Sequence, residues 1–312
     1  MNRLILLRIG SLLKKISNFL DILSNRIITY LKIKYDNNYT IFNHEGGKRF
    51  KLPSISPFSI FFRDKNFKNT IMFYSRSNAE PLLRKIVFSL YQKKLINPKN
   101  SIIDIGSWLG DNSLIWATFL ENEGRIFSID PSQSNLAYSK EIAELNNIKN
   151  ISWIEAVCAE KEGISLDFDG SIDHTSFKKI SGSSGSRISS TLDKLMQKEG
   201  SPKIGLMHVD VEGFELSVLK GAKNIIKESM PAIIFEQHIS KEDINLVSKY
   251  LKSFGYRIFM INEVLPICDL DCRNFIAIDN SIESMDLEGF SECKARGHGI
   301  FSASIGSTLL EI

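Results

Sequence analysis

The chain has 312 residues, of which 43% are apolar and 24% charged, and its net charge at neutral pH is +3. This length excludes more than two domains of ordinary size, and the apolar content excludes an intrinsically disordered chain. The charge is unevenly placed: residues 1–34 hold seven Lys or Arg and one Asp, a local charge of +6, which leaves 3 − 6 = −3 for the rest. A mildly acidic remainder gives no reason to expect nucleic acid as a partner.

The first segment, residues 1–34, is predicted to be a basic amphipathic helical extension. Its longest apolar run, Leu4 to Leu7, is broken by Arg8 and is far shorter than the roughly 20 apolar residues that span a bilayer. Such a helix can lie in a membrane interface, pack on the core of its own chain or pack on a dimer partner, and the sequence leaves these alternatives open. The apolar residues at helical spacing are Leu12, Leu13, Ile16, Phe19, Leu20, Leu23, Ile27 and Leu31.

The four cysteines, Cys158, Cys268, Cys272 and Cys293, are too few for a disulfide framework in a chain of this length. Together with the missing secretory signal, they predict reduced thiols in a cytoplasmic protein, peripheral to the inner face of a membrane if the first helix binds lipid. Cys268 and Cys272 are spaced as half of a zinc site, but no second pair stands at ligand spacing, so no metal is predicted.

Residues 35–98 are predicted to form a cap region before the main domain. Residues 39–52 alternate in polarity around two glycines at 46–47, which indicates a β-hairpin. Residues 78–94 have helical spacing of their leucines, and Asn78 is a suitable N-cap.

The main domain, residues 99–280, shows apolar runs that mostly alternate with helical segments. This order predicts a largely parallel seven-stranded sheet with helices on both faces, the α/β Rossmann-like arrangement. A short link between the last two runs implies an antiparallel strand at the edge. Residues 281–312 are predicted to be a tail of uncertain order that could pack on a neighbouring copy. The expected strands are residues 101–105, 125–129, 151–157, 204–210, 231–236, 256–261 and 273–278.

A turn after the first of these strands has the features of a cofactor-binding loop. The strand carries Asp104 near its end, and Gly106 and Gly110 follow before a helix-like stretch. The second strand ends at Asp130, 24 positions after Gly106, where an acid can bind ribose hydroxyls and would repel a 2′-phosphate. Trp108 occupies a position where a pyrophosphate needs bare backbone. The turn therefore suits an adenosine ligand without a phosphate bridge, and S-adenosylmethionine is the candidate.

Further acids stand at the ends of two later strands. Asp210 and Glu212 close the strand at 204–210 just before a helix, and Glu236 closes the strand at 231–236 with His238 two residues later. Parallel strands bring their carboxyl ends to one edge of a sheet, so these groups are expected to lie close together. His208, within its strand, is predicted to be a core residue.

The stretch from Gly170 to Ser190 is rich in Ser and Gly. It is predicted to be a solvated surface loop, with a mobile lid over the acceptor as the alternative. His174 is the ring in it that can carry a proton near neutral pH.

On these motifs the chain resembles the FkbM family of S-adenosylmethionine-dependent methyltransferases, over about residues 100 to 280. Two positions depart from the family pattern: Trp108 stands where the family usually has Asn, and Asp130 where it usually has Glu. The matching stretches are Ile103-Asp-Ile-Gly106 with Gly110, Ile129-Asp-Pro131, Ser190-Thr-Leu-Asp193, Val209-Asp-Val-Glu-Gly-Phe-Glu215 with Leu219-Lys-Gly-Ala222, and Pro231 to Glu236.

The resemblance implies the fold of a class I methyltransferase, S-adenosylmethionine as cofactor and transfer of its methyl group. We predict Asp210, Glu236 and His238 as catalytic candidates, with His238 having the natural pKa of a base. Asp210 and Glu236 could instead orient sugar hydroxyls or share a divalent ion. The predicted cofactor contacts are Asp104, Gly106, Gly110, Asn112, Asp130, Glu155, Ala156 and Asp210.

By resemblance, the expected reaction is O-methylation of a sugar hydroxyl in a polysaccharide or glycolipid. Methylation of a small metabolite or lipid is the first alternative. A nicotinamide-dependent oxidoreductase on a similar sheet is disfavoured by the missing third glycine of the turn. A noncatalytic scaffold is disfavoured by the intact acids at the strand ends. Self-association of the chain stays open.

Overall fold

The computed structural model describes residues 39–43, 49–53, 81–121, 124–168, 177–179, 187–238, 244–261, 272–282 and 309–312. The predictions for the helix at residues 1–34, the N-cap Asn78, His174 and most of the tail lie outside this part of the chain. Within it, no helix is both long and apolar enough to cross a bilayer.

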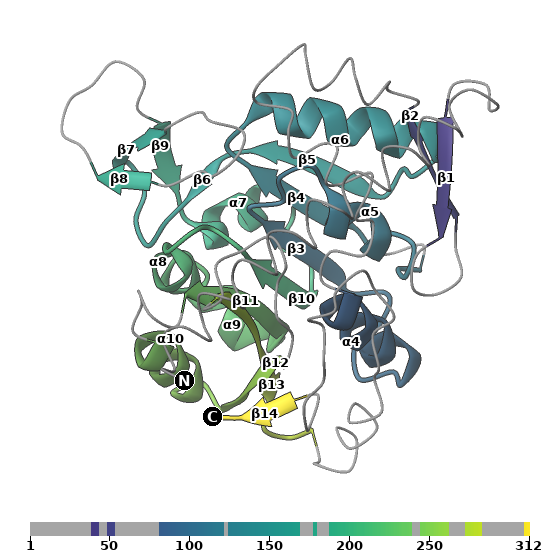
Figure 1. Cartoon of the computed structure of the whole chain (residues 1–312). Helices are drawn as coiled ribbons and strands as arrows, with labels where there is room; N and C mark the ends of the chain where they lie inside the picture. Colours follow the sequence, from purple (N-terminus) through teal and green to yellow (C-terminus); the bar gives the residue numbers. More distant parts are fainter. Residues whose placement is uncertain are drawn as a thin grey trace, which may run out of the picture.

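A twisted eight-stranded sheet forms the centre of the molecule (Figure 1). The five strands from β11 to β5 are parallel, and β13, β12 and β14 continue the sheet in antiparallel fashion. All seven predicted strands and the antiparallel edge are therefore confirmed. In spatial order the strands are β14 (Leu309–Glu311), β12 (Tyr256–Ile261), β13 (Cys272–Asp279), β11 (Ala232–His238), β10 (Ile204–Val209), β3 (Ser101–Ile105), β4 (Ile126–Asp130) and β5 (Ile151–Glu155).

The eighth strand, β14, comes from the tail for which we predicted no definite order. Glu311 accepts two hydrogen bonds from Arg257 of β12, at 2.9 and 2.8 Å, and Lys252 donates to the carbonyl of Ile312 at 2.7 Å. The guanidinium of Arg257 lowers the pKa of Glu311. A strand of three residues is too short to show an alternating pattern in the sequence. The hydrogen bonds of Glu311 and Lys252 hold it at the edge of the sheet.

Helices cover both faces of the sheet because the strand side chains alternate between two apolar cores. Ile102 and Leu206 face the core shared with α4 (Pro81–Gln92), α5 (Asp111–Trp116) and α6 (Gln133–Leu145). Ile103 and Met207 face the core on the other side. The helices there are α7 (Leu192–Lys198), α8 (Glu215–Lys220), α9 (Lys223–Ser229) and α10 (Ile244–Lys252).

Two smaller β elements flank this core (Figure 1). The predicted hairpin is present as β1 (Tyr39–Asn43) and β2 (Arg49–Pro53), paired antiparallel. A four-stranded sheet has the order β6, β9, β7, β8. Its strands are β6 (Val157–Cys158), β7 (Ser165–Phe168), β8 (Phe177–Lys179) and β9 (Arg187–Ser190).

This second sheet corrects our prediction for the Ser- and Gly-rich stretch, because β8 and β9 lie within it. Ser189 is only 4% exposed and bonds in both directions: its N–H donates to Ile164 O at 2.9 Å, and its hydroxyl donates to Lys161 O at 2.7 Å. The hydroxyl also accepts the Ile164 N–H at 3.0 Å. Ser189, in a stretch that we predict to be solvated, thus satisfies backbone groups of Lys161 and Ile164.

Two of the family motifs meet in one junction behind the sheet. Asp193 of α7 accepts the N–H groups of Asn224 and Ile225 at 3.0 Å each, and its own N–H donates to Gly221 O at 2.9 Å. A Cβ on Gly221 would stand 2.2 Å from the carbonyl oxygen of Ala159. The Ser-Thr-Leu-Asp and Leu-Lys-Gly-Ala stretches are therefore packing and capping elements.

The junction predicts a difference between two glycine substitutions. Gly221 has an ordinary φ of −74° but no room for a Cβ, whereas Gly163 has a φ of +75° and open space around it. Gly221→Ala should lower the free energy of unfolding by about 3 kcal/mol, through overpacking against fixed backbone. Gly163→Ala should cost about 1 kcal/mol of backbone strain. Urea unfolding measures both, and equal costs would contradict the proposed role of the junction.

Candidate active site

The candidate site lies where β3 and β10 are neighbours in the sheet. From β3 the chain proceeds to β4 on one side, and from β10 it proceeds to β11 on the other. Open α/β sheets bind ligands at the carboxyl ends of strands at such a reversal of strand order. The two strand ends are joined directly, because the Asp210 N–H donates to Ile105 O at 3.0 Å.

The two glycines of the turn are required by close contacts with the backbone after β10 and with α6. A Cβ on Gly106, whose φ is +75°, would stand 1.7 Å from the carbonyl oxygen of Asp210. The first obstacle to a larger residue at this position is therefore the backbone after β10. A Cβ on Gly110 would stand 2.9 Å from Ser139 of α6, so a glycine at this position lets α6 pack close to the turn.

Asp130 lies at the end of β4 and is 5% exposed. Its Oδ2 accepts the Trp108 N–H at 2.9 Å, and its Oδ1 accepts the Ser132 N–H at 2.8 Å and the Asn135 amide at 3.2 Å. Burial raises the pKa of Asp130 to about 6, against the lowering effect of these donors, and the nearby Asp104 adds to the rise. The carboxylate thus holds the glycine turn onto β4.

Trp108 reaches Asp130 with its backbone in the left-handed region, at a φ of +45°. This conformation is costly for a bulky side chain and is tolerated best by Gly and Asn. Asn is the residue that the family pattern has at this position, so the substitution keeps the turn and adds strain to it.

Asp104 lies deeper, below the crevice, and is 1% exposed. Its Oδ2 accepts the Ser113 hydroxyl at 2.5 Å, and its Oδ1 lies 2.8 Å from His208 Nδ1. His208 is 3% exposed and stacks edge-on against Trp116 of α5, at 5.3 Å between ring centroids. The prediction of a core role for His208 is confirmed. Asp104 has two protein partners, and its direct contact with the cofactor stays a prediction.

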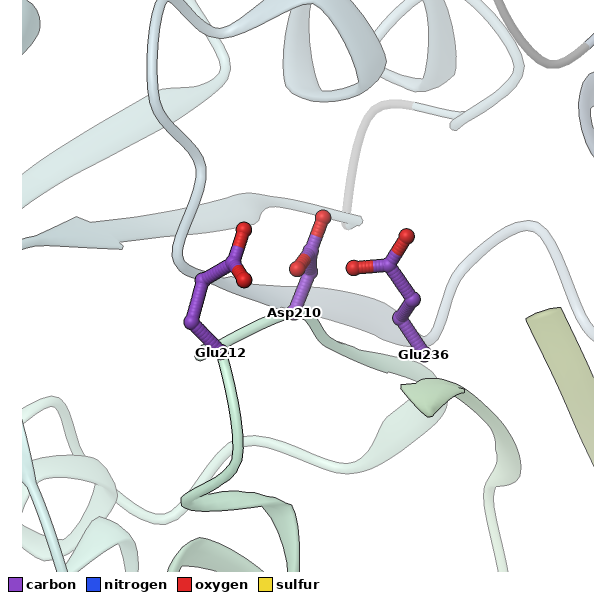
Figure 2. Close-up of side chains that lie close together, drawn as sticks. All are labelled: Asp210, Glu212 and Glu236. Atoms are coloured by element: carbon purple, nitrogen blue, oxygen red, sulfur yellow. The ribbon is translucent and has the colours of Figure 1, made fainter. Parts of the chain in front are cut away.

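Three carboxyl groups meet at the ends of β10 and β11. Figure 2 shows Asp210 between Glu212 and Glu236, and one oxygen from each lies within 4.8 Å of the others. Glu236 is 6% exposed and lies opposite Asn274 of β13. Burial raises the pKa of Asp210 well above its usual range, the charges of Glu236 and Glu212 and a hydrogen bond with Glu236 add to the rise, and His208 opposes it.

The closeness of these carboxyl groups therefore favours the protonated form of Asp210 more than in an exposed aspartate. The three oxygens are near enough for one cation as well, but no described residue beyond these acids points to a metal there. We assign none.

Glu215 fixes the turn that carries these acids, a role that sequence patterns did not reveal. It is 2% exposed, and its Oε1 accepts the N–H groups of Val211 at 3.2 Å and Gly213 at 3.1 Å. The turn needs this support because Glu212 and Gly213 have φ values of +51° and +99°. An acid in the first turn of the helix was the available signal in the sequence.

The remaining predicted residues have varied positions. Asn112, 5% exposed, accepts a hydrogen bond from Arg84 at 2.9 Å. Glu155 is exposed at the end of β5, opposite Asp130, and pairs with Arg187. The Ala156 N–H donates to the Asp130 carbonyl at 3.3 Å. Of His238 the structure describes only the backbone, which ends β11 opposite Cys272.

The strand order, the glycine turn and the acid at the end of β4 define a Rossmann-like fold built for an adenosine cofactor. Residues 104–258, about half of the chain, match the sequence model of the Methyltransferase FkbM domain. The chain belongs to the FkbM family of S-adenosylmethionine-dependent methyltransferases. This assignment favours methyl transfer over hydride transfer with a nicotinamide cofactor. The residues fit S-adenosylmethionine, because Asp130 can accept a ribose hydroxyl and Trp108 stands where a pyrophosphate would need bare backbone.

Several solved methyltransferase structures are similar to the chain at low identity and with low TM-scores. The FkbM methyltransferase from Methylobacillus flagellatus KT is 18% identical, over 69% of this chain and 55% of that one, with a TM-score of 0.45. The present chain thus spans little more than half of that protein. Precorrin-6y C5,15-methyltransferase from Geobacter metallireducens GS-15 is 13% identical over 63% and 87%, with a TM-score of 0.39. A SAM-dependent methyltransferase from Aquifex aeolicus is 13% identical over 64% and 97%, at 0.34. No curated protein sequence matches the chain.

The raised pKa of Asp130 predicts pH-dependent cofactor binding. The ionised carboxylate of Asp130 has one acceptor site left beside its three protein donors and can take a ribose hydroxyl there, so with a pKa of about 6 the dissociation constant of S-adenosylhomocysteine should rise roughly tenfold from pH 7 to pH 5. Titration calorimetry measures the change. Asp130→Asn should bind more weakly at pH 7 and show a flat profile. A flat profile in the wild-type protein would mean that Asp130 does not meet the ribose.

The turn predicts a graded response at Glu215. Glu215→Ala removes the acceptor of two N–H groups and should destabilise the protein by about 1–3 kcal/mol. Glu215→Gln keeps an acceptor oxygen and should cost less. Hydrogen exchange at the Val211 and Gly213 amides should be fast in the alanine variant and near wild type in the glutamine variant. Unchanged exchange in both would show that other groups hold the turn.

Proposed function

We propose that the chain methylates a hydroxyl oxygen of a sugar in a polysaccharide or glycolipid. The observation that supports this acceptor is the cluster of Asp210, Glu212 and Glu236 at the crevice. Carboxylates are hydrogen-bond acceptors, and a sugar offers several hydroxyl donors in a row, so the two surfaces are complementary. A small metabolite or lipid with hydroxyl groups is the alternative acceptor.

The cofactor supplies a methyl group on a sulfonium, ready for in-line displacement. The chain has to align the acceptor oxygen and remove its proton, and a positioned base contributes roughly 10²–10⁴-fold. Burial and the neighbouring acids raise the pKa of Asp210, so its carboxylate is a stronger base for the hydroxyl proton than an exposed aspartate would be. In this scheme Glu212, at the exposed end of the cluster, orients neighbouring hydroxyls. His238 is the second candidate base.

The acceptor class is tested by supplying cofactor with a labelled methyl group and fractionated polysaccharide, glycolipid and small-molecule extracts. Label should appear in carbohydrate and survive mild alkali, because an ether is stable where a methyl ester is cleaved. Label confined to small molecules supports the alternative acceptor. Alkali-labile or nitrogen-bound label would overturn O-methylation of a hydroxyl.

Once an acceptor is found, two substitutions separate the candidate bases. Glu236→Gln keeps size and one acceptor but removes the charge that helps to raise the pKa of Asp210, so turnover should fall ~10²-fold while the affinity for S-adenosylhomocysteine stays within about twofold. His238→Gln should give the same fall if the histidine takes the proton, and should change only the Michaelis constant of the acceptor if it positions the sugar. Asp210→Asn requires a melting curve beside the rate, because Asp210 also begins the turn before α8. Wild-type rates in all three would contradict the proposed base.

A further inference from the structure

Arg84 of α4 is a buried cation close to the cofactor turn. Its side chain is 4% exposed, its Nε donates to Asn112 Oδ1 at 2.9 Å, and its Nη2 lies 2.5 Å from Asp111 Oδ2. Among the lysines and arginines that the structure describes, it alone is buried. It precedes the segment matched by the family model, which begins at residue 104, so no motif pointed to it.

This arrangement is not explained by stability alone. A buried ion pair contributes little net stability compared with apolar residues of similar volume, because both charges lose their hydration. Val87, one turn further along α4 on the same face, is fully buried in the apolar core, so the surroundings of this face accept apolar side chains. The guanidinium is better explained by what it does to its two partners on α5.

Arg84 fixes the orientation of the Asn112 amide. A guanidinium has donors and no acceptor, so only the amide oxygen of Asn112 can face it. The amide nitrogen, with its two N–H donors, must therefore point away from α4. Asn112 belongs to the first turn of α5, two residues after Gly110, at the level of the cofactor turn. At 5% exposure its side chain is shielded from bulk water. A hydrogen bond to an anion is stronger in such an environment than in water.

The crevice otherwise presents acids: Asp130 at β4, and Asp210, Glu212 and Glu236 at β10 and β11. These groups suit the ribose hydroxyls, the ammonium and the sulfonium of the cofactor. They repel its one anionic group, the carboxylate of the methionine part. That carboxylate requires a hydrogen-bond donor, and the Asn112 amide, held by the ion pair of Arg84 and Asp111, can supply one.

We propose that Asn112 donates an amide N–H to the methionine carboxylate of the cofactor and that Arg84 is the positioning residue that sets the amide for this contact. The pair forms a carboxylate subsite contributed partly from outside the family domain. The inference rests on the cofactor and not on the acceptor, so it stands or fails separately from the proposed O-methylation.

Two ligands separate this subsite from the rest of the cofactor site. S-adenosylhomocysteine contains the amino-acid carboxylate, whereas 5′-methylthioadenosine keeps the adenosine and thioether and lacks that carboxylate. 5′-Methylthioadenosine lacks the ammonium as well, so titration calorimetry of both ligands against each variant measures the contribution of the whole amino-acid end. A new negative side chain that weakens this contribution identifies the carboxylate, because it would strengthen binding of the ammonium. Melting temperatures report on folding independently.

Asn112→Asp is the decisive variant. It keeps an acceptor for Arg84, and the melting temperature checks that a second carboxylate beside the pair of Arg84 and Asp111 leaves the fold intact. It also replaces the donor with a negative charge, so S-adenosylhomocysteine should bind at least tenfold more weakly while 5′-methylthioadenosine stays within twofold. Equal losses for the two ligands, or no loss for either, would overturn the proposal.

Arg84→Met and Arg84→Lys test the positioning role. The methionine variant should weaken S-adenosylhomocysteine about fivefold without affecting 5′-methylthioadenosine, and the lysine variant should restore part of the affinity because its ammonium also bonds the amide oxygen. Arg125→Met is the matched control, since Arg125 is exposed and bonds Ser152 on the far strand pair. If Arg84→Met does not fold, Asn112→Asp still decides the question, because it leaves Arg84 in place.

Discussion

The contact between the ends of β3 and β10 is the constraint on which the site depends. Gly106 and the carbonyl of Asp210 are so close that a single Cβ would collide with backbone, at 1.7 Å. The same contact places the cofactor turn and the first of the clustered acids side by side. Methyl transfer needs donor and acceptor in line, and here the relative position of their two binding elements is set by backbone, which cannot adjust as a side chain can.

Buried polar groups then carry this constraint across the sheet. Asp104 of β3 and His208 of β10 lie opposite each other and form a hydrogen-bonded pair beneath the contact. Ser113 ties the pair to α5, and Asp130 ties the glycine turn to β4. Each group has partners within the protein, so the low dielectric strengthens these bonds rather than penalising them. The cofactor turn is thereby fixed from three sides before any ligand arrives.

The sequence was sufficient for the sheet because its strands are long apolar runs closed by acids. It also placed Asp210, Glu212 and Glu236 at one edge, since parallel strands leave no other arrangement. It failed where a residue acts through geometry that has no periodic signature. Glu215 and Asp193 were visible as motif letters, but their function, to accept backbone N–H groups across a turn or between helices, depends on tertiary placement. Ser189 was misjudged for the same reason, because composition cannot distinguish a solvated serine from one that completes a strand.

Arg84 shows why a family pattern describes a site incompletely. The matched domain supplies an acidic crevice, which is favourable for a sulfonium cofactor and a hydroxyl acceptor but unfavourable for the carboxylate of that cofactor. A compensating cation placed among the acids would form ion pairs with them and raise the cost of proton transfer at Asp210 and Glu236. On α4 the guanidinium is separated from the cluster and acts through a neutral amide, Asn112. The acids keep their function, and the guanidinium, paired with Asp111, orients an amide donor toward the part of the ligand that alone is negative.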